Sequence, residues 1–261
     1  MSKQTSLPIA VQLYTLRHLE QPLDVTLGQV AAAGYAGVET IRDHGLSAAE
    51  MKDLLAKHNL KAICTHVPLA AAEDELDALI AFNQAIGNDC ICVPALPQEE
   101  RNRDAKGWLE MGRRLGAIGK RCAGEGMRFL YHNHAWEMVE MDGKLAIDWL
   151  FEGASPEHLQ WEPDLGWIVR GDVDPLVLLQ RHAGRCARIH VKDVAAAGQN
   201  EDQMGFADVG YGTLDWAALL PAAKAAGGEW YIVEHDLPKD PVQTVNRSCE
   251  FLQKALAPLY A

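Results

Sequence analysis

Short apolar runs alternate with longer amphipathic stretches along this chain, and this alternation constrains the fold more than any other feature. The runs have strand length and are rich in β-branched and aromatic residues, whereas the stretches between them show helical spacing. The eight runs are Ile9–Leu13, Gly37–Thr40, Ala62–His66, Cys90–Ala95, Arg128–His132, Leu159–Pro163, Ala187–Val191 and Trp230–Glu234. Helices are expected at Val25–Ala33, Ala48–His58, Glu73–Ile86, Trp108–Gly124, Asp174–His182, Leu214–Ala226 and Val242–Leu256, with a weaker one near Leu145–Glu152.

Alternation of strands and helices predicts parallel strands that are joined by crossover helices. Eight such units close into a (β/α)8 barrel, and the length of 261 residues matches the usual size of about 250 residues. An open doubly wound sheet is the competing fold, but no G-x-G-x-x-G follows the first run and no P-loop occurs. Because no linker-like change in composition is present, we expect a single α/β TIM barrel domain over residues 1–261.

The net charge and the cysteines indicate which partners and which cellular compartment to expect. The formal net charge is −12 and no basic run is present, so nucleic acid is not an expected partner. The N-terminus has no apolar signal core, and no apolar run is long enough for a membrane span. The cysteines form no C-x-x-C motif, so we expect reduced core residues and a cytoplasmic location. They are Cys64, Cys90, Cys92, Cys122, Cys186 and Cys249.

Ionisable side chains stand at the ends of most runs. In a TIM barrel the functional side chains gather at the carboxyl ends of the strands, so these residues are expected to share one rim. They are Glu39 and His66 on the second and third runs, and His132, His134, Glu137, Glu162, Asp164, His190, Lys192, Glu234, His235 and Asp236 on the last four. Carboxylates that converge with imidazole suit a divalent cation such as Mn²⁺, Co²⁺ or Mg²⁺, with Zn²⁺ as a further option.

Several of these residues also have structural interpretations. His66 is equally compatible with a satisfied structural histidine. Glu162 is expected to orient a ligand rather than to bind the cation itself. Lys192 is either half of a surface ion pair with Asp193 or an electrophile in the barrel mouth. The remaining structural interpretations are a salt bridge for Glu39 and loop positions for His235 and Asp236. Unpaired buried charges are costly, so ionisable groups on most strand ends favour a functional site.

Seven motifs follow one another along nearly the whole chain. They are VQLYTLR (residues 11–17), GVE (37–39), YHNHAWE (131–137), EPDLGW (162–167), IHVKD (189–193), VGYG (209–212) and IVE (232–234). Together they resemble the sugar phosphate isomerase/epimerase family of the xylose isomerase-like TIM barrel superfamily. This superfamily also includes hydroxypyruvate isomerase, tagatose-type ketose epimerases, inosose dehydratase and endonuclease IV.

The resemblance implies one divalent metal that is held by Glu, Asp, His and Glu from strands five to eight, with Mn²⁺ as the expected ion and Co²⁺, Mg²⁺ or Zn²⁺ as alternatives. Asp164, His190 and Glu234 match the last three positions. Many relatives carry Glu within strand five, where this chain has His132. We therefore expect Glu137 to turn back and supply the first ligand, with His132 as the alternative.

The resemblance also implies proton transfer next to the carbonyl of a keto-sugar or related polyol ketone, through an enediolate, by an isomerase or epimerase. Glu137 and Glu234 are expected to exchange the proton, with a histidine base as the fallback. Lys192 and His66 are expected to hydrogen-bond developing negative charge or sugar hydroxyls. Further contacts to substrate or to the ligands are expected from Glu39, His132, His134, Glu162 and Trp167, of which Trp167 replaces a histidine that is frequent in ketose epimerases.

Alternative functions use the same residues. A dehydratase or other lyase, or an enzyme that cleaves a 3-keto-glycoside, differs only in the leaving group. The non-enzyme alternative is a carbohydrate-binding subunit, against which Asp164, His190 and Glu234 argue. An endonuclease is disfavoured because the ligands for a three-metal cluster are not evident. A phosphorylated substrate is not favoured because no Arg or Lys accompanies Gly210-Tyr211-Gly212, although Arg17 offers one cation. A homo-oligomer is compatible with the sequence, which indicates no interface.

Overall fold

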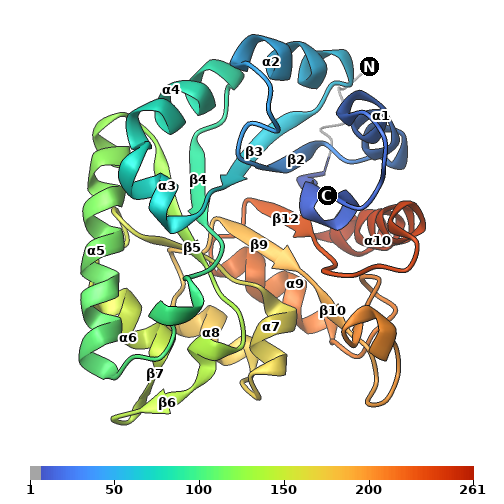
Figure 1. Cartoon of the computed structure of the whole chain (residues 1–261). Helices are drawn as coiled ribbons and strands as arrows, with labels where there is room; N and C mark the ends of the chain where they lie inside the picture. The colour runs from blue at the N-terminus through green and yellow to red at the C-terminus, as the bar shows by residue number, and fades with distance from the viewer. Residues whose placement is uncertain (1–6) are drawn as a thin grey trace.

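Eight parallel strands form a ring in the computed structural model, which describes residues 7–261 (Figure 1). Hydrogen bonds connect them in the order β8-β5-β4-β3-β2-β1-β12-β9. Helices cover the outside of the ring, so the strands are buried on both faces, as parallel strands generally are. The strands are β1 (Ile9–Gln12), β2 (Gly37–Ile41), β3 (Lys61–His66), β4 (Cys90–Val93), β5 (Arg128–His132), β8 (Gln160–Glu162), β9 (Arg188–Val191) and β12 (Trp230–Val233). The predicted TIM barrel is confirmed.

The ring closes between β8 and β9 through a single parallel bridge, which pairs Asp164 with His190. The backbone N–H of His190 donates to the carbonyl of Pro163 over 2.9 Å. Pro163 has no N–H of its own, so it cannot contribute a donor to a longer ladder at this point. The closure excludes the open doubly wound sheet, and it places the bridge at the carboxyl ends of the strands.

The helices begin where the sequence supplies capping residues. Asp104 accepts a hydrogen bond from the N–H of Gly107, so α5 begins at Ala105, three residues before the expected Trp108. Asp240 caps the last helix through the N–H of Gln243. The helices are α1 (Leu23–Ala33), α2 (Ala48–Lys57), α3 (Leu69–Asp74), α4 (Leu76–Ile86), α5 (Ala105–Gly124), α6 (Ala146–Glu152), α7 (Leu165–Arg170), α8 (Pro175–Arg181), α9 (Trp216–Ala225) and α10 (Pro241–Leu256).

The expectation of one helix over Glu73–Ile86 was wrong, because the structure contains α3 and α4 on either side of Glu75. The backbone of Glu75 leaves the helical region, with φ −119° and ψ 15°. Its side chain instead pairs with Arg42 over 2.6 Å. The periodicity of the sequence did not reveal this bend because apolar residues continue on both sides of it.

Two short hairpins extend from the carboxyl end of the barrel, and the sequence patterns did not predict them. One pairs β6 (Glu140–Met141) with β7 (Lys144–Leu145), and the other pairs β10 (Asp193–Val194) with β11 (Phe206–Ala207).

All six cysteines are buried and free, as expected. Among the helices of residues 7–261, none is long and apolar enough to cross a membrane.

The amino end of the barrel interior is sealed. Apolar side chains fill it, namely those of Ala10, Ile63, Cys64, Cys90, Cys92, Leu130 and Ile232. Arg188 lies beside this layer, where its Nε donates to the carbonyl of Ile63 over 2.8 Å and its guanidinium pairs with Glu229 over 2.9 Å. Polar groups higher in the barrel are therefore accessible only from the carboxyl ends of the strands.

Candidate active site

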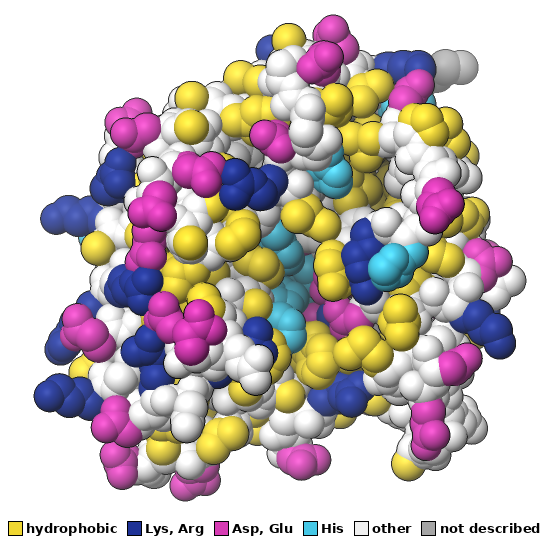
Figure 2. Space-filling model, in the orientation of Figure 1, with side chains coloured by type: hydrophobic (Ala, Val, Ile, Leu, Met, Phe, Trp, Pro, Cys, Tyr) yellow, Lys and Arg dark blue, Asp and Glu magenta, His cyan; other side chains and the backbone are white. Residues whose placement is uncertain are grey.

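A cavity of about 370 Å³ opens at the carboxyl ends of the strands. Figure 2 shows histidines inside a central hollow that is surrounded by apolar side chains. The cavity is lined by Tyr14, Ile41, His66, Val67, Pro68, Pro94, Ala95, His132, His134, Glu234 and Asp236. A hollow of about 390 Å³ beside α6 and α8 is similar in size but includes none of the barrel-strand ends. The strand-end cavity is therefore the candidate active site.

Four buried side chains form a possible metal site beside this cavity. They are His132 at the end of β5, Asp164 after β8, His190 on β9 and Glu234 after β12, and one ligand atom from each lies within 4.8 Å of the others. Nε2 of His132 is 3.7 Å from Oδ2 of Asp164, and Nδ1 of His190 is 3.2 Å from Oε2 of Glu234. The structure thus brings together three of the four predicted ligands, and His132 provides the fourth position.

The chemistry of this group fits a divalent cation. Oδ2 of Asp164 is buried and accepts no well-formed hydrogen bond, whereas Oδ1 of the same carboxylate caps α7 through the N–H of Trp167 over 2.9 Å. The cap fixes the orientation of the carboxylate. Two imidazoles and two carboxylates form a donor set that first-row divalent metals accept.

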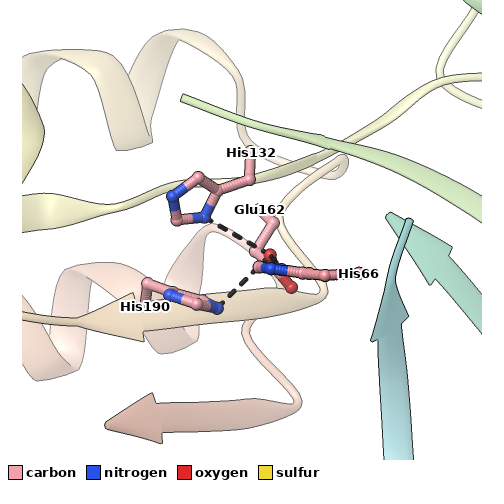
Figure 3. A group of neighbouring side chains, drawn as sticks. All are labelled: His66, His132, Glu162 and His190. Carbon is pink, nitrogen blue, oxygen red and sulfur yellow. Dashed lines mark hydrogen bonds and ion pairs between the residues drawn. The ribbon is translucent and has the colours of Figure 1, made fainter. Parts of the chain in front are cut away.

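A second group lies deeper in the barrel, around the carboxylate of Glu162 (Figure 3). Its Oε2 is 2.7 Å from Nε2 of His66, 3.3 Å from Nε2 of His190 and 3.4 Å from Nδ1 of His132. The contact with His66 has the length of a hydrogen bond. Because Glu162 faces Nε2 of His190 and Nδ1 of His132, the opposite nitrogen of each ring faces the first group, as in carboxylate–histidine–metal arrangements.

Glu39 supports the same histidines from β2. Its Oε2 lies 2.6 Å from Nε2 of His190 and 3.1 Å from Nε2 of His66. Gln12 donates to the same oxygen over 2.8 Å and so holds the carboxylate in place. Glu39 is fully buried and is not among the residues that line the cavity, so it acts on the histidines rather than on a ligand in the cavity.

The buried carboxylates determine the protonation of the histidines beside them. Burial lowers the pKa of His66 and His190, but Glu39 and Glu162 outweigh this effect and hold both pKa values well above 6.5. Burial alone would raise the pKa of Glu234, yet Lys192 and His190 hold it well below its ordinary value. In the metal-free protein, protons on the histidines therefore balance charge that a bound cation would also balance.

Lys192 is a fully buried cation next to the predicted ligands. Its Nζ lies 2.9 Å from carboxylate oxygens of Asp164, Glu234 and Asp236. Burial disfavours its charge, but these carboxylates hold its pKa well above 10.5. The lysine therefore remains charged and ties three carboxylates together, instead of forming the surface pair with Asp193 that the sequence also allowed.

Glu137 belongs to none of the three groups of possible metal ligands among the described residues, the third of which is Glu39, Cys64 and Glu162. Its carboxylate accepts hydrogen bonds from the hydroxyl of Tyr131 and, over 2.8 Å, from the backbone N–H of His134. Burial raises the pKa of Glu137 to about 7, although these two donors oppose the rise. The carboxyl group therefore anchors the turn that carries His134.

His134 lines the cavity, and aromatic side chains hold its ring. Its ring stacks on Trp136 with centroids 4.1 Å apart, and Trp167 lies 5.2 Å away on a tilted plane. Nδ1 of His134 is buried and has no hydrogen-bond partner among the described residues. Burial, followed by the charge of His132, holds the pKa of His134 well below 6.5, so the ring is neutral at neutral pH.

Sequence reasoning missed some of the residues that form the cavity. Asp236 was interpreted as a loop residue, but it lines the cavity and pairs with Lys192. The sequence signal for Asp236 was its position two residues after Glu234, since residues two apart in an extended segment point to the same side. Tyr14 and the apolar residues after β2 to β4 were also missed, because an uncharged strand end does not stand out from ordinary core sequence.

Comparisons with known proteins agree on the family. The model of the family described as xylose isomerase-like TIM barrel matches residues 27–255. An inosose dehydratase from Geobacillus thermodenitrificans is 30% identical over 140 residues, which span 49% of this chain and 46% of that protein. An inosose dehydratase from Lacticaseibacillus casei is 24% identical over 261 residues, which span 86% of this chain and 85% of the relative.

Solved structures agree on the fold. A sugar phosphate isomerase/epimerase from Parabacteroides distasonis superimposes with a TM-score of 0.81 at 19% identity, over 100% of this chain and 98% of that protein. The 3-keto-D-glucoside 4-epimerase from E. coli superimposes with a TM-score of 0.69 at 16% identity, over 95% and 99% of the two chains. The proteins that match this chain thus include dehydratases by sequence and an epimerase by fold.

Proposed function

Because this chain belongs to the xylose isomerase-like TIM barrel family, we propose that it moves a proton next to the carbonyl of a keto-sugar or keto-polyol with the aid of one divalent cation. The observation that carries this proposal is the buried group of His132, Asp164, His190 and Glu234, of which His132 and Glu234 line the strand-end cavity. Unpaired buried carboxylates are costly, and without a metal Lys192 and the proton on His190 supply the positive charge that a divalent cation would also supply.

His132, Asp164, His190 and Glu234 would hold the cation. A divalent cation in this position supplies Lewis-acid polarisation of a substrate carbonyl and lowers the energy of an enediolate. Mn²⁺ is our preferred ion because carboxylates make up half of the donors, and Co²⁺, Mg²⁺ and Zn²⁺ are the alternatives. Lys192 holds the carboxylates of Asp164 and Glu234 in place through its ion pairs with both.

His134 is the base that we propose for removing the proton. It lines the cavity, its Nδ1 is free, and the anchored turn holds its ring against Trp136. A neutral imidazole can accept a proton from carbon and return it later. Glu137 fixes the backbone of this turn, and Glu234 is the second group that can exchange a proton with the substrate.

The fate of the enediolate determines the reaction. Return of the proton to the opposite face of the same carbon gives an epimer, and its delivery to the neighbouring carbonyl carbon gives an isomer. Loss of a hydroxyl from the β-carbon, together with one proton, releases water and gives an unsaturated ketone. Isomerisation or epimerisation is the main proposal, and dehydration is the second candidate because the curated relatives include several inosose dehydratases.

The test follows hydrogen exchange in D₂O with purified protein, scyllo-inosose and 3-keto-sugars, each with and without added Mn²⁺. We expect deuterium to enter the carbon next to the carbonyl only with the metal, and His134→Gln to abolish this exchange. Glu250→Gln on the exposed face of α10 is the matched control. Exchange without loss of water indicates isomerisation or epimerisation, whereas growth of the ultraviolet absorbance of an unsaturated ketone indicates dehydration. Absence of exchange from all substrates and metals would refute the proposal.

A further inference from the structure

The cavity has two chemically different halves. His132, His134, Glu234 and Asp236 come from the end of β5 and the segments that follow β5 and β12. The ends of β1 to β4 supply an apolar wall, which consists of Tyr14, Ile41, Val67, Pro68, Pro94 and Ala95. Among the described residues, His66 and the phenol of Tyr14 are the ionisable lining groups from these four strands. A ligand that reaches the cation therefore turns its other side toward the apolar wall.

The apolar wall cannot satisfy the hydroxyl groups of a polyol. Of its six side chains, only Tyr14 carries a hydrogen-bonding group. A sugar hydroxyl placed against the others would lose its water and gain no partner, which is unfavourable. An alkyl or aryl group in the same place would instead lose contact with water at no such cost, and aromatic carbon packs well against proline and tyrosine rings.

The usual phosphate position of a TIM barrel is filled by the chain itself. Phosphate sites in this fold are frequently formed by the loops after the seventh and eighth strands. Here Oδ2 of Asp193, just after the seventh barrel strand, accepts hydrogen bonds from the N–H groups of Gly210 and Gly212 and from Nε1 of Trp216, over 2.9, 3.1 and 2.7 Å. Its Oδ1 accepts from the N–H groups of Val194 and Leu214.

The loop over residues 210–214 packs directly against the Asp193 carboxylate. Asp193 is fully buried, and a Cβ added to Gly212 would lie 2.2 Å from its Oδ1. Successive backbone N–H groups of this kind form an anion-binding concavity. Because a carboxylate of the chain already satisfies these donors, they are not available to a phosphate of the substrate.

The two cationic side chains near the cavity, Lys192 and Arg17, already have partners within the protein. Lys192 is surrounded by three carboxylates. Arg17 has no carboxylate partner among the described residues, but its guanidinium lies 3.6 Å above the ring of Tyr14 and donates to the carbonyls of Tyr14 and Asp236. Neither side chain lines the cavity. A phosphate dianion would therefore find no lysine or arginine among the described residues that line the cavity.

We propose that the substrate is an unphosphorylated keto-sugar that bears an uncharged apolar substituent, such as an alkyl or aryl aglycone, and that the apolar wall binds this substituent. The proposal rests on the proposed function, since the cation must hold the carbonyl end for the substituent to reach the wall. It also separates this chain from relatives described as acting on sugar phosphates.

A matched series of three ligands tests the proposal: methyl 3-keto-β-D-glucoside, phenyl 3-keto-β-D-glucoside and the 6-phosphate of the methyl compound. Calorimetry with Mn²⁺-loaded protein gives the dissociation constants, and deuterium exchange gives kcat/KM, with scyllo-inosose as the unsubstituted reference. We expect the phenyl compound to bind about tenfold more tightly than the methyl compound or better, which is the usual effect of filling an apolar pocket. The phosphate is expected to bind more weakly than both.

Variants of the wall connect the preference to these residues. Tyr14→Ala and Ile41→Ala are expected to reduce the ratio of phenyl to methyl affinity, whereas Val177→Ala on the exposed face of α8 is the control and leaves the ratio unchanged. Equal affinity for methyl and phenyl compounds would overturn the proposal. So would tighter binding of the phosphate, and loss of that binding in Arg17→Gln would identify its partner. If no compound exchanges deuterium, the proposed function fails, and the calorimetric ratio still tests the wall.

Discussion

Replacing Lys192 with methionine tests whether this lysine and a bound cation compensate the same carboxylates. The substitution keeps an unbranched side chain of similar length but removes the charge. It leaves Asp164, Glu234 and Asp236 without the ammonium that lies 2.9 Å from each of them. Removing one partner from a buried ion pair costs about 3–5 kcal/mol in the free energy of unfolding. At about 2–4 °C per kcal/mol for a chain of this size, Tm of the metal-free variant should fall by about 6–20 °C.

Added metal should restore much of this loss. A ligand at about 1,000 times its Kd stabilises the native state by about 4 kcal/mol. In the native protein, Lys192 repels a cation that shares Asp164 and Glu234 with it, whereas the variant has no such repulsion. The rise in Tm on adding Mn²⁺ should therefore be larger in the variant than in the native protein. This comparison separates a charge effect from a packing defect, because a metal does not repair packing.

Differential scanning calorimetry of both proteins, after treatment with chelator and again with Mn²⁺, measures both effects. Lys254→Met on α10 is the matched control, since Lys254 is exposed and pairs only with Glu250. We expect no measurable change in Tm for the control. An equal rise in Tm on metal addition in the Lys192 variant and the native protein would refute the reasoning, because the lysine and the cation would then not share their carboxylates.

Three further predictions concern the same site. Asp164→Asn is expected to lower the bound metal from about one ion per chain to none, as measured by elemental analysis, while the backbone bridge to His190 keeps the circular dichroism spectrum unchanged. Because carboxylates hold the pKa of His190 above 6.5, Mn²⁺ uptake should release protons and become tighter as pH rises, which calorimetry in buffers of different ionisation enthalpy measures. Glu137 has a pKa of about 7 against an ordinary 4.5, so the native protein retains a proton that the unfolded chain has lost, and stability should fall by about 3 kcal/mol as pH rises from 4.5 to 7. Urea unfolding at pH 5 and pH 8 measures the fall, which should be smaller in Glu137→Gln by most of this amount; the fall that remains reflects His66 and His190, whose pKa values are also raised.

The sequence patterns predicted the barrel because both kinds of periodicity are strong. A parallel strand that is buried on both faces forms a continuous apolar run, and Ile9–Gln12 and Trp230–Val233 are examples. Bends and small hairpins depend on a few backbone angles, and they leave no periodic trace. The break at Glu75 and the pairing of β10 with β11 are therefore visible only in the structure.

The candidate site was only partly predictable for a related reason. Asp164, His190 and Glu234 lie at or just after strand ends, where chain position alone fixes their place on the rim. Glu137 lies five residues beyond the end of β5, and the intervening turn decides where its carboxylate points. The hydroxyl of Tyr131 and the N–H of His134 draw it away from the possible ligands. Such competition between local partners cannot be recovered from residue spacing.

The bridge between Asp164 and His190 gives the barrel a seam. Where the other neighbouring barrel strands share a ladder, β8 and β9 meet through this single bridge, and the side chains of the same two residues face the predicted cation. An ion coordinated by both side chains would link β8 and β9 at the point where these two strands share a bridge rather than a ladder. Metal binding and barrel closure would then be coupled. Separation of β8 from β9 would move Asp164 and His190 apart, and a bound ion would oppose that separation.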